Sequence, residues 1–409
     1  MHVAESMTIV ADVDQILAAI SLIIILGYVG DAIFRATRIP EILILMSIGI
    51  AIGPLAHVLP DSYISTLRNL APIFSSIALI MILFNSGTAM RIFDKESKGY
   101  VGVVLAFLDV ALSCLAVGAL MHYVFQWPLV YGALLGVIVG ETSSVIVLPI
   151  AKKLKISKDL YNILIMETIF NSVFSILAFY LILVFITGSN FSPYSYVQYI
   201  VDYMSVPVLL GLLTGIIWIA LRNTIKVASN YTASLAIAIL LYSLVDFLGG
   251  SAAMSILVYA VIMGNDQIIS KLMHMSSPVS NKKSKFVERE FEFIIRTFFF
   301  VFIGMIAILS VDYLIFAVAV TAALLLLRLI EVNPLILRVS KSYRNLTYSL
   351  MQKGLGVAVL SSIYYGLGLP YSTEIFSVSF TIIILSNIIS AVLIRWSSKQ
   401  IMLVATTSP

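Results

Sequence analysis

Two polar stretches interrupt apolar segments that are long enough to cross a lipid bilayer. One covers residues 140–144, Gly-Glu-Thr-Ser-Ser, and the other covers residues 167–172, Glu-Thr-Ile-Phe-Asn-Ser. Keeping a carboxylate at such a depth costs free energy, so an ionisable residue there indicates a function. Carboxylate, hydroxyl and amide oxygens can hold a proton or a small cation, and the pattern therefore predicts a path for ions through the membrane.

The second stretch places its polar residues on one face of a helix. Glu167, Thr168, Asn171, Ser172 and Ser175 follow the spacing i, i+1, i+4, i+5 and i+8. A single Ser or Thr in such a helix usually bonds to its own carbonyls. Five polar residues on one stripe instead predict the lining of a cavity.

Counting residues from the helix ends at 1.5 Å each estimates their depth. Glu141 lies about 18 Å from the outer end of its helix, near the membrane centre. Glu167 and Arg328 lie at matching depths, about 10 Å from the cytoplasmic ends of their helices, so we expect a structural ion pair. Asp109 is also near the centre, where it could relay protons or make a purely structural hydrogen bond to a neighbouring helix. Glu331 is nearer a helix end, and we expect it to reach the membrane surface.

Composition predicts an all-α polytopic membrane protein. The chain of 409 residues is 60% hydrophobic and 11% charged, with a mean hydropathy of +1.05, as is typical of membrane helix bundles. We expect about 13 transmembrane helices in a single membrane domain, 1–409. Their approximate ranges are 14–34, 40–58, 68–89, 99–125, 129–151, 160–187, 196–221, 231–249, 252–273, 287–310, 312–336, 344–367 and 373–395.

The basic residues predict the orientation. With thirteen spans, most of the 25 Lys and Arg residues fall in alternate loops on one side, including those in 35–38, 152–158 and 282–285. The positive-inside rule then places the N-terminus outside and the C-terminus in the cytoplasm of a plasma or inner membrane. The net charge of +4 therefore reflects orientation, and we expect no nucleic-acid partner.

Two spans look broken rather than continuous. The fifth carries Gly132, Gly136 and Gly140 at four-residue spacing, a small-residue face that lets another helix approach closely. The twelfth carries Gln-Lys-Gly-Leu-Gly at 352–356. These spans are seven helices apart and run in opposite directions, which predicts an inverted repeat of helices one to six against eight to thirteen. Where the two broken helices cross, Glu141 and Lys353 would each offset a helix end of opposite partial charge.

Metal and enzyme chemistry are disfavoured. The four histidines lie at the N-terminus or near helix ends, so the sequence predicts no zinc cluster. The chain also lacks a His-Glu-x-x-His motif and a Walker-type glycine loop. We expect no enzyme activity, no cofactor and no metal beyond a transported cation.

These motifs resemble those of the monovalent cation:proton antiporter superfamily, most closely its NhaP-like sodium/proton exchangers. The family shows Thr-Asp-Pro in helix five and Glu-Ser-x-x-Asn-Asp in helix six, where this chain has Thr-Ser-Ser at 142–144 and the 167–172 stretch. Arg328 matches the family's Arg that partners the helix-six Glu. Lys353 and the glycine after it stand where Arg-Gly is usual.

The resemblance implies an inverted-repeat antiporter fold with two broken crossing helices, assembled as a homodimer. The ion-transporting core would be 99–187 and 312–395, the dimerisation scaffold 14–89 and 231–310, and the linker helix 196–221. A mid-membrane carboxylate would bind either H+ or a monovalent cation (Na+, K+ or Li+). This competition, combined with alternating access, would give exchange across the bilayer.

The departures from the family pattern matter most. Ser172, Ser143 and Asn85 stand where the family has acids, whereas Glu141 replaces a small residue. We hypothesise that Glu141 has taken over as the proton-carrying, cation-binding group.

Oxygens of neighbouring residues would help it to hold the cation. They belong to Thr142, Ser143, Thr168, Asn171 and Ser172. One such carboxylate predicts one-for-one, electroneutral exchange. A cation channel or uniporter, a non-transporting sensor on the same scaffold and an intramembrane enzyme are the alternatives.

Overall fold

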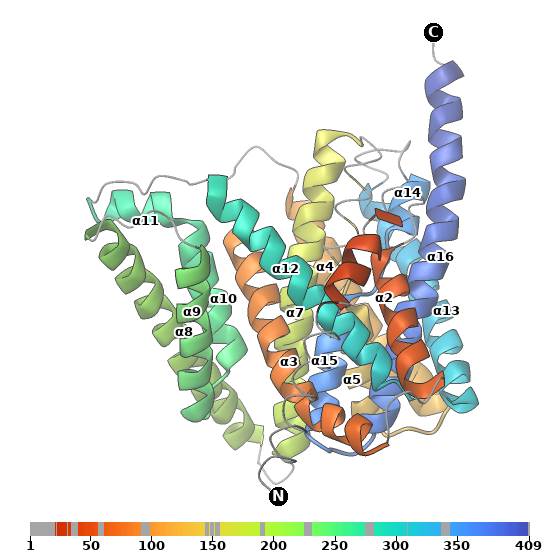
Figure 1. Cartoon of the computed structure of the whole chain (residues 1–409), viewed down its shortest axis with the longest axis horizontal. Coiled ribbons are helices and arrows are strands. Elements are labelled where there is room, and N and C mark those ends of the chain that lie inside the picture. Colours follow the sequence, from red (N-terminus) through yellow and green to blue (C-terminus); the bar gives the residue numbers. More distant parts are fainter. Residues whose placement is uncertain are drawn as a thin grey trace, which may run out of the picture. The chain divides into compact units, whose positions relative to one another are not determined.

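All secondary structure in the described residues is helical (Figure 1). The computed structural model describes residues 21, 23–30, 32–33, 40–55, 61–90, 99–143, 147, 151, 156–188, 193–224, 231–274, 282–308, 310–336 and 344–407. The helices are α2 (Glu41–Ile50), η1 (Ala51–Leu55), α3 (Asp61–Ala89), α4 (Gly99–Tyr123), α5 (Leu129–Gly140), α7 (Lys158–Thr187), α8 (Pro193–Thr224), α9 (Tyr231–Phe247), α10 (Ala252–Gly264), α11 (Asp266–Leu272), α12 (Lys282–Met305), α13 (Val311–Ile336), α14 (Arg344–Ser349), α15 (Leu355–Gly366) and α16 (Ser372–Thr407).

The chain divides into two compact units. The smaller unit comprises residues 1–69 and 289–308. In it, α2 packs tightly on α12, because a Cβ at Gly49 would lie 2.2 Å from the Val301 carbonyl oxygen. Arg296 of α12 also pairs with Glu41 of α2 at 3.1 Å.

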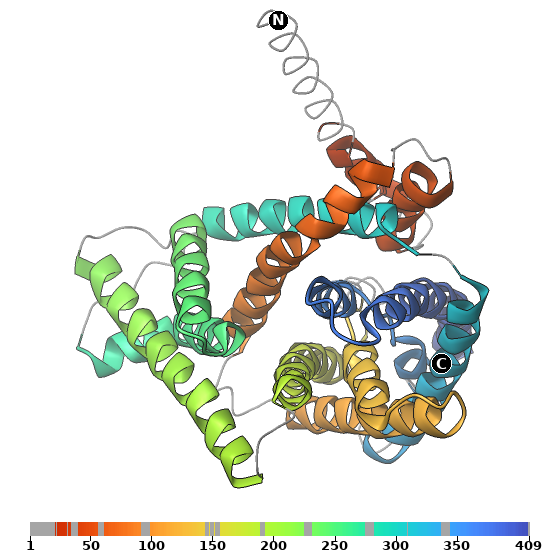
Figure 2. The same ribbon diagram turned by 90° about the horizontal axis from the view of Figure 1, so that it is seen from below.

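The larger unit comprises residues 70–288 and 309–409. In it, α4, α5, α7, α13, α15 and α16 form one bundle (Figure 2). The predicted small-residue face of α5 lies against α4: a Cβ at Gly136 would come within 2.4 Å of the Ser113 carbonyl oxygen. Ser157 caps the N-terminus of α7 by accepting a hydrogen bond from the Leu160 N–H.

A second group of helices in the larger unit is built from α8, α9 and α10. The helix α10 packs on α8 and α9, and α11 follows it after a bend of 74° at Asn265. A continuous span at 252–273 was expected, so this bend is a correction. The Asn265 side chain donates to the Met90 and Val261 carbonyl oxygens, and Asp266 pairs with Arg222 of α8 at 2.7 Å, which fixes the turn.

The described helices follow the expected spans. Six are long and apolar enough to cross a membrane, or seven if the α10/α11 pair counts as one span. Each of the thirteen expected ranges contains helical residues, but interrupted helices such as α5 and α15 are too short to cross alone. The basic residues at 35–38 and 152–155, on which the predicted orientation depends, lie outside the described residues.

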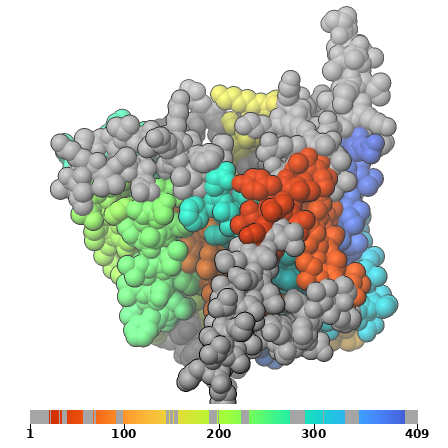
Figure 3. Space-filling model, viewed as in Figure 1, coloured from red at the N-terminus to blue at the C-terminus, as the bar shows by residue number. Residues whose placement is uncertain are grey.

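Apolar side chains cover outward surfaces of this helical protein. On α9, Leu240 is 69% exposed and Phe247 is 88% exposed, and the helix belongs to the green surface in Figure 3. Such exposure is costly in water but favourable against lipid tails. It is therefore in keeping with a multi-pass membrane protein.

Candidate functional site

Two helices of the larger unit are interrupted at the positions that the sequence predicted. The first, α5, ends at Gly140, and Glu141 continues it in an extended conformation with φ −60° and ψ 132°. The second has a non-helical segment at 350–354 between α14 and α15. The two segments touch, because the Ser143 N–H donates to the Gln352 carbonyl oxygen at 2.9 Å.

An asparagine from a neighbouring helix bonds to the backbone at each break. Asn171 of α7 accepts the Thr142 N–H at 2.7 Å and donates to the Gly140 carbonyl oxygen at 3.4 Å. Asn387 of α16 donates to the Lys353 carbonyl oxygen at 2.7 Å. These bonds satisfy backbone groups that the helix breaks leave without intrahelical partners.

Glu141 and Lys353 lie at helix ends of opposite partial charge. The Lys353 Nζ donates to the Gly140 carbonyl oxygen at 3.0 Å, at the negative C-terminal end of α5. The Glu141 carboxyl group packs against Gly356 in the first turn of α15, where a Cβ would lie 2.6 Å from Glu141 Cδ. That turn is the positive end of α15, so each charge lies at a helix end of opposite partial charge.

The Glu141 side chain is only 2% exposed. Its Oε1 accepts a hydrogen bond from the Ser172 hydroxyl at 2.8 Å. Its Oε2 has no hydrogen-bond partner among the described residues. One oxygen of a buried carboxyl group is thus left for a proton or a cation.

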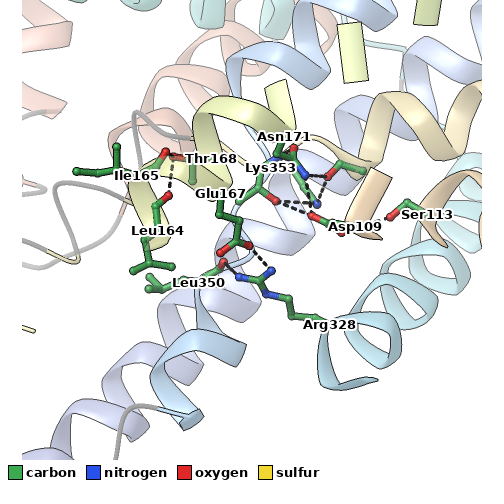
Figure 4. Close-up of polar contacts among 12 residues, drawn as sticks. Asp109, Ser113, Leu164, Ile165, Glu167, Thr168, Asn171, Arg328, Leu350 and Lys353 are labelled. Carbon is green, nitrogen blue, oxygen red and sulfur yellow. Dashed lines mark hydrogen bonds and ion pairs between the residues drawn. The ribbon is translucent and has the colours of Figure 1, made fainter. Parts of the chain in front are cut away.

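Asp109 of α4 lies in the same network but is more fully bonded (Figure 4). It accepts hydrogen bonds from the Asn171 amide at 2.9 Å, the Thr142 hydroxyl at 3.3 Å and the Ser113 hydroxyl at 3.5 Å. The Thr142 hydroxyl is also 3.3 Å from Lys353 Nζ. Three hydrogen bonds thus fix the Asp109 side chain within the crossing.

Glu167 of α7 and Arg328 of α13 form a buried ion pair (Figure 4). Arg328 also donates to the Leu350 carbonyl oxygen at 3.3 Å, which ties the pair to the broken segment before α15. Glu167 is 0% exposed and Arg328 is 4% exposed. The pair therefore links three parts of the bundle.

Some residues predicted as cation ligands make other contacts. The Thr168 hydroxyl donates to the Leu164 carbonyl oxygen of its own helix at 2.9 Å. The Asn171 side-chain oxygen already accepts the Thr142 N–H. Ser143 is buried and reaches the crossing through its backbone. Among the residues predicted to bind the cation, Ser172 is the one whose side chain bonds to the Glu141 carboxyl group in the described part of the chain.

Two buried polar residues at the second break were not predicted as site residues. Asn387 bonds to the Lys353 carbonyl oxygen, and Gln352 is fully buried with no hydrogen bond to its side chain among the described residues. Counting depth along the last span would have found Asn387. Glu331 was expected at the membrane surface, but it is 2% exposed because α4, α14 and α16 pack around α13.

Comparison with known proteins supports this architecture. A family described as "Sodium/hydrogen exchanger, transmembrane" matches residues 19–399. The chain belongs to this sodium/hydrogen exchanger family. The structure of the sodium proton antiporter MjNhaP1 from Methanocaldococcus jannaschii matches with a TM-score of 0.74, 20% identity, and coverage of 95% of this chain and 98% of that one. At this identity the match shows the fold, including the expected antiporter architecture.

Two curated relatives are similar over part of their length. Sodium/hydrogen exchanger 7 of Arabidopsis thaliana is 27% identical over 52% of this chain and 20% of the relative. The K(+)/H(+) antiporter NhaP2 of Shewanella oneidensis is 26% identical over 56% of this chain and 40% of the relative. The chain thus matches less than half the length of these two relatives. Its family comprises transporters of monovalent cations and protons rather than enzymes.

Proposed function

We propose that this protein exchanges a monovalent cation for H+ by alternating access, with Glu141 as the carboxyl group that carries each in turn. The observation that carries the proposal is the position of Glu141 at the crossing. The group is buried, it faces the positive end of α15, and it has one oxygen without a hydrogen-bond partner among the described residues. A proton or a cation would neutralise its charge at that oxygen.

The contrast with Asp109 favours Glu141 as the carrier. Asp109 accepts three hydrogen bonds among the described residues, so its oxygens are already engaged. Among the same residues, Glu141 accepts one side-chain hydrogen bond, from the Ser172 hydroxyl. Binding of a cation or proton is therefore more favourable at Glu141 than at Asp109. A cation bound there could keep the Ser172 hydroxyl as a second oxygen ligand.

The similar proteins support monovalent cations as substrates, because they include exchangers of sodium and of potassium. A single exchanging carboxylate would make the exchange electroneutral, with one cation moved for each H+. We further propose a homodimer with its N-terminus outside, in which 99–187 and 312–395 move against 14–89 and 231–310, with 196–221 as the linker.

The test is cation-driven proton flux in proteoliposomes that contain a pH-sensitive dye, with Na+, K+ or Li+ supplied in turn. We expect the parent protein to move protons in response to at least one of these cations and Glu141→Gln to be inactive. A Glu141→Gln variant with the parent's flux would refute the role of Glu141.

A potential-sensitive dye in the same vesicles separates antiport from its alternatives. A channel or uniporter would generate a cation diffusion potential without proton flux, and a sensor would generate neither signal. Ser113→Ala is a matched control, because it removes a 3.5 Å contact to Asp109 and leaves every described contact of Glu141 in place.

A further inference from the structure

Glu331 on α13 is a second buried carboxyl group, and the proposed antiport leaves it without a role. Its side chain is 2% exposed. Neither of its oxygens has a hydrogen-bond partner among the described residues. An ionised carboxylate in this state is strongly disfavoured, so the group must bind a proton or a cation.

Glu331 is close enough to the buried ion pair and to the crossing to interact electrostatically with both. It lies three residues after Arg328, which puts both on one face of α13. Arg328 binds Glu167 and Leu350 through its terminal nitrogens, while its Nε has no partner among the described residues. Glu167 Oε2 is also unpartnered there. Unused donors and acceptors are therefore present on both members of the pair and on Glu331.

Among the described residues, the formal charges around the crossing do not balance. The described buried ionisable groups of this network are four acids and two bases, namely Asp109, Glu141, Glu167, Glu331, Arg328 and Lys353. Four negative and two positive charges would leave a formal charge of −2. Two monovalent cations or protons are therefore needed to neutralise it.

The hydrogen bonds indicate which acid binds the second of the two cations or protons. The proposed antiport places the first on Glu141. Glu167 is paired with Arg328, and Asp109 accepts three hydrogen bonds. Glu331 is the remaining acid of the set, and its oxygens are unbonded among the described residues.

We propose that Glu331 is a second proton-binding site of the transporter and that it shares Arg328 with Glu167. The inference rests on the proposed antiport. While Glu331 is protonated, Arg328 stays on Glu167. When the proton leaves to water at higher pH, the Glu331 carboxylate competes for Arg328 through the free Nε.

The loss of this proton would slow exchange. Deprotonation of Glu331 weakens the Glu167–Arg328 pair that links α7 to α13, because Arg328 then interacts with two carboxylates instead of one. The charged groups that act on Glu331 are Arg328 on its own helix, Asp109 of α4, Glu167 of α7 and Lys353 before α15. Glu331 is thus a positioning residue that acts on the crossing through Arg328.

The experiment compares the parent, Glu331→Gln and Glu331→Asp as full chains in proteoliposomes over a range of pH. Gln mimics the protonated acid, so we expect Glu331→Gln to keep exchange at higher pH, with the upper midpoint of the profile raised by about one unit or more. We also expect the infrared difference between acid and alkaline buffer to lose one carboxyl band in Glu331→Gln and to keep a shifted band in Glu331→Asp.

Parent-like pH profiles and carboxyl bands in Glu331→Gln would overturn the inference. If Glu141→Gln is inactive in the same series, the proposed antiport still holds although the inference about Glu331 fails. An active Glu141→Gln would overturn both. A folded Glu331→Gln that is inactive at every pH would make Glu331 the primary carrier and would also overturn the shared role. If Glu331→Gln fails to fold, the band of Glu331→Asp decides: a shifted band supports the inference, and an unshifted one refutes it.

Discussion

Gly356 is expected to set the position of the Glu141 carboxyl group. A Cβ at residue 356 would lie 2.6 Å from Glu141 Cδ and 2.8 Å from its Oε1. Carbon atoms in contact normally lie about 3.5–4.0 Å apart, so Gly356→Ala must displace the carboxyl group by roughly 1 Å. We therefore expect Gly356→Ala to weaken cation binding without breaking a helix.

The size of the effect follows from the hydrogen bond to Ser172. A displacement of roughly 1 Å directed away from Ser172 would lengthen the 2.8 Å contact beyond hydrogen-bonding range. Hydrogen bonds to charged groups contribute about 1.5–3 kcal/mol. The concentration of cation that gives half-maximal proton flux should then rise by roughly 10- to 150-fold.

The assay is dye-monitored proton flux in proteoliposomes at graded cation concentrations. Glu141→Asp shortens the side chain by one carbon–carbon bond, about 1.5 Å. The double variant Glu141→Asp/Gly356→Ala should therefore recover part of the loss. Gly118→Ala is the matched control, because its nearest neighbour would be Ala133 N at 3.3 Å. An unchanged half-maximal concentration in Gly356→Ala would refute the reasoning.

Two further predictions concern stability. Arg328→Met alone should lower the free energy of unfolding by about 3–5 kcal/mol, because it leaves the buried Glu167 carboxylate without its partner. Thermal unfolding in detergent measures this, and a Glu167→Gln/Arg328→Met double variant no more stable than Arg328→Met would contradict it. Asn387→Ala should cost about 1–3 kcal/mol, since the Lys353 carbonyl oxygen loses its 2.7 Å hydrogen bond. Ser386→Ala, which removes a longer 3.3 Å contact, should cost less in the same measurement.

Features that follow from local sequence could be predicted. The glycines of α5 indicated close approach to another helix, and the polar residues at 140–144 and 352–356 indicated the two breaks. The ion pair between Glu167 and Arg328 followed from matching depth, because two charges at one level of a bilayer stabilise each other. The helix-end positions of Glu141 and Lys353 followed from the crossing itself.

Features that depend on which helices pack around a residue could not be predicted. Depth counting is one-dimensional, so it placed Glu331 near the surface although α4, α14 and α16 enclose it. It also gave no sign that Thr168 would bond to its own helix, or that α11 would turn away from α10 by 74°. The division into core and scaffold stays a prediction for the same reason.

Because both helix breaks are held by asparagine, the groups that maintain the structure differ from the groups that titrate. Amide groups do not ionise in the physiological range, so Asn171 and Asn387 hold the interrupted backbones with the same strength in acid and in alkali. Titration is thereby confined to the carboxyl groups and Lys353. A proton or metal ion arriving at the centre of the bilayer can alter the local charge while the hydrogen bonds that keep the two chain breaks in register remain intact.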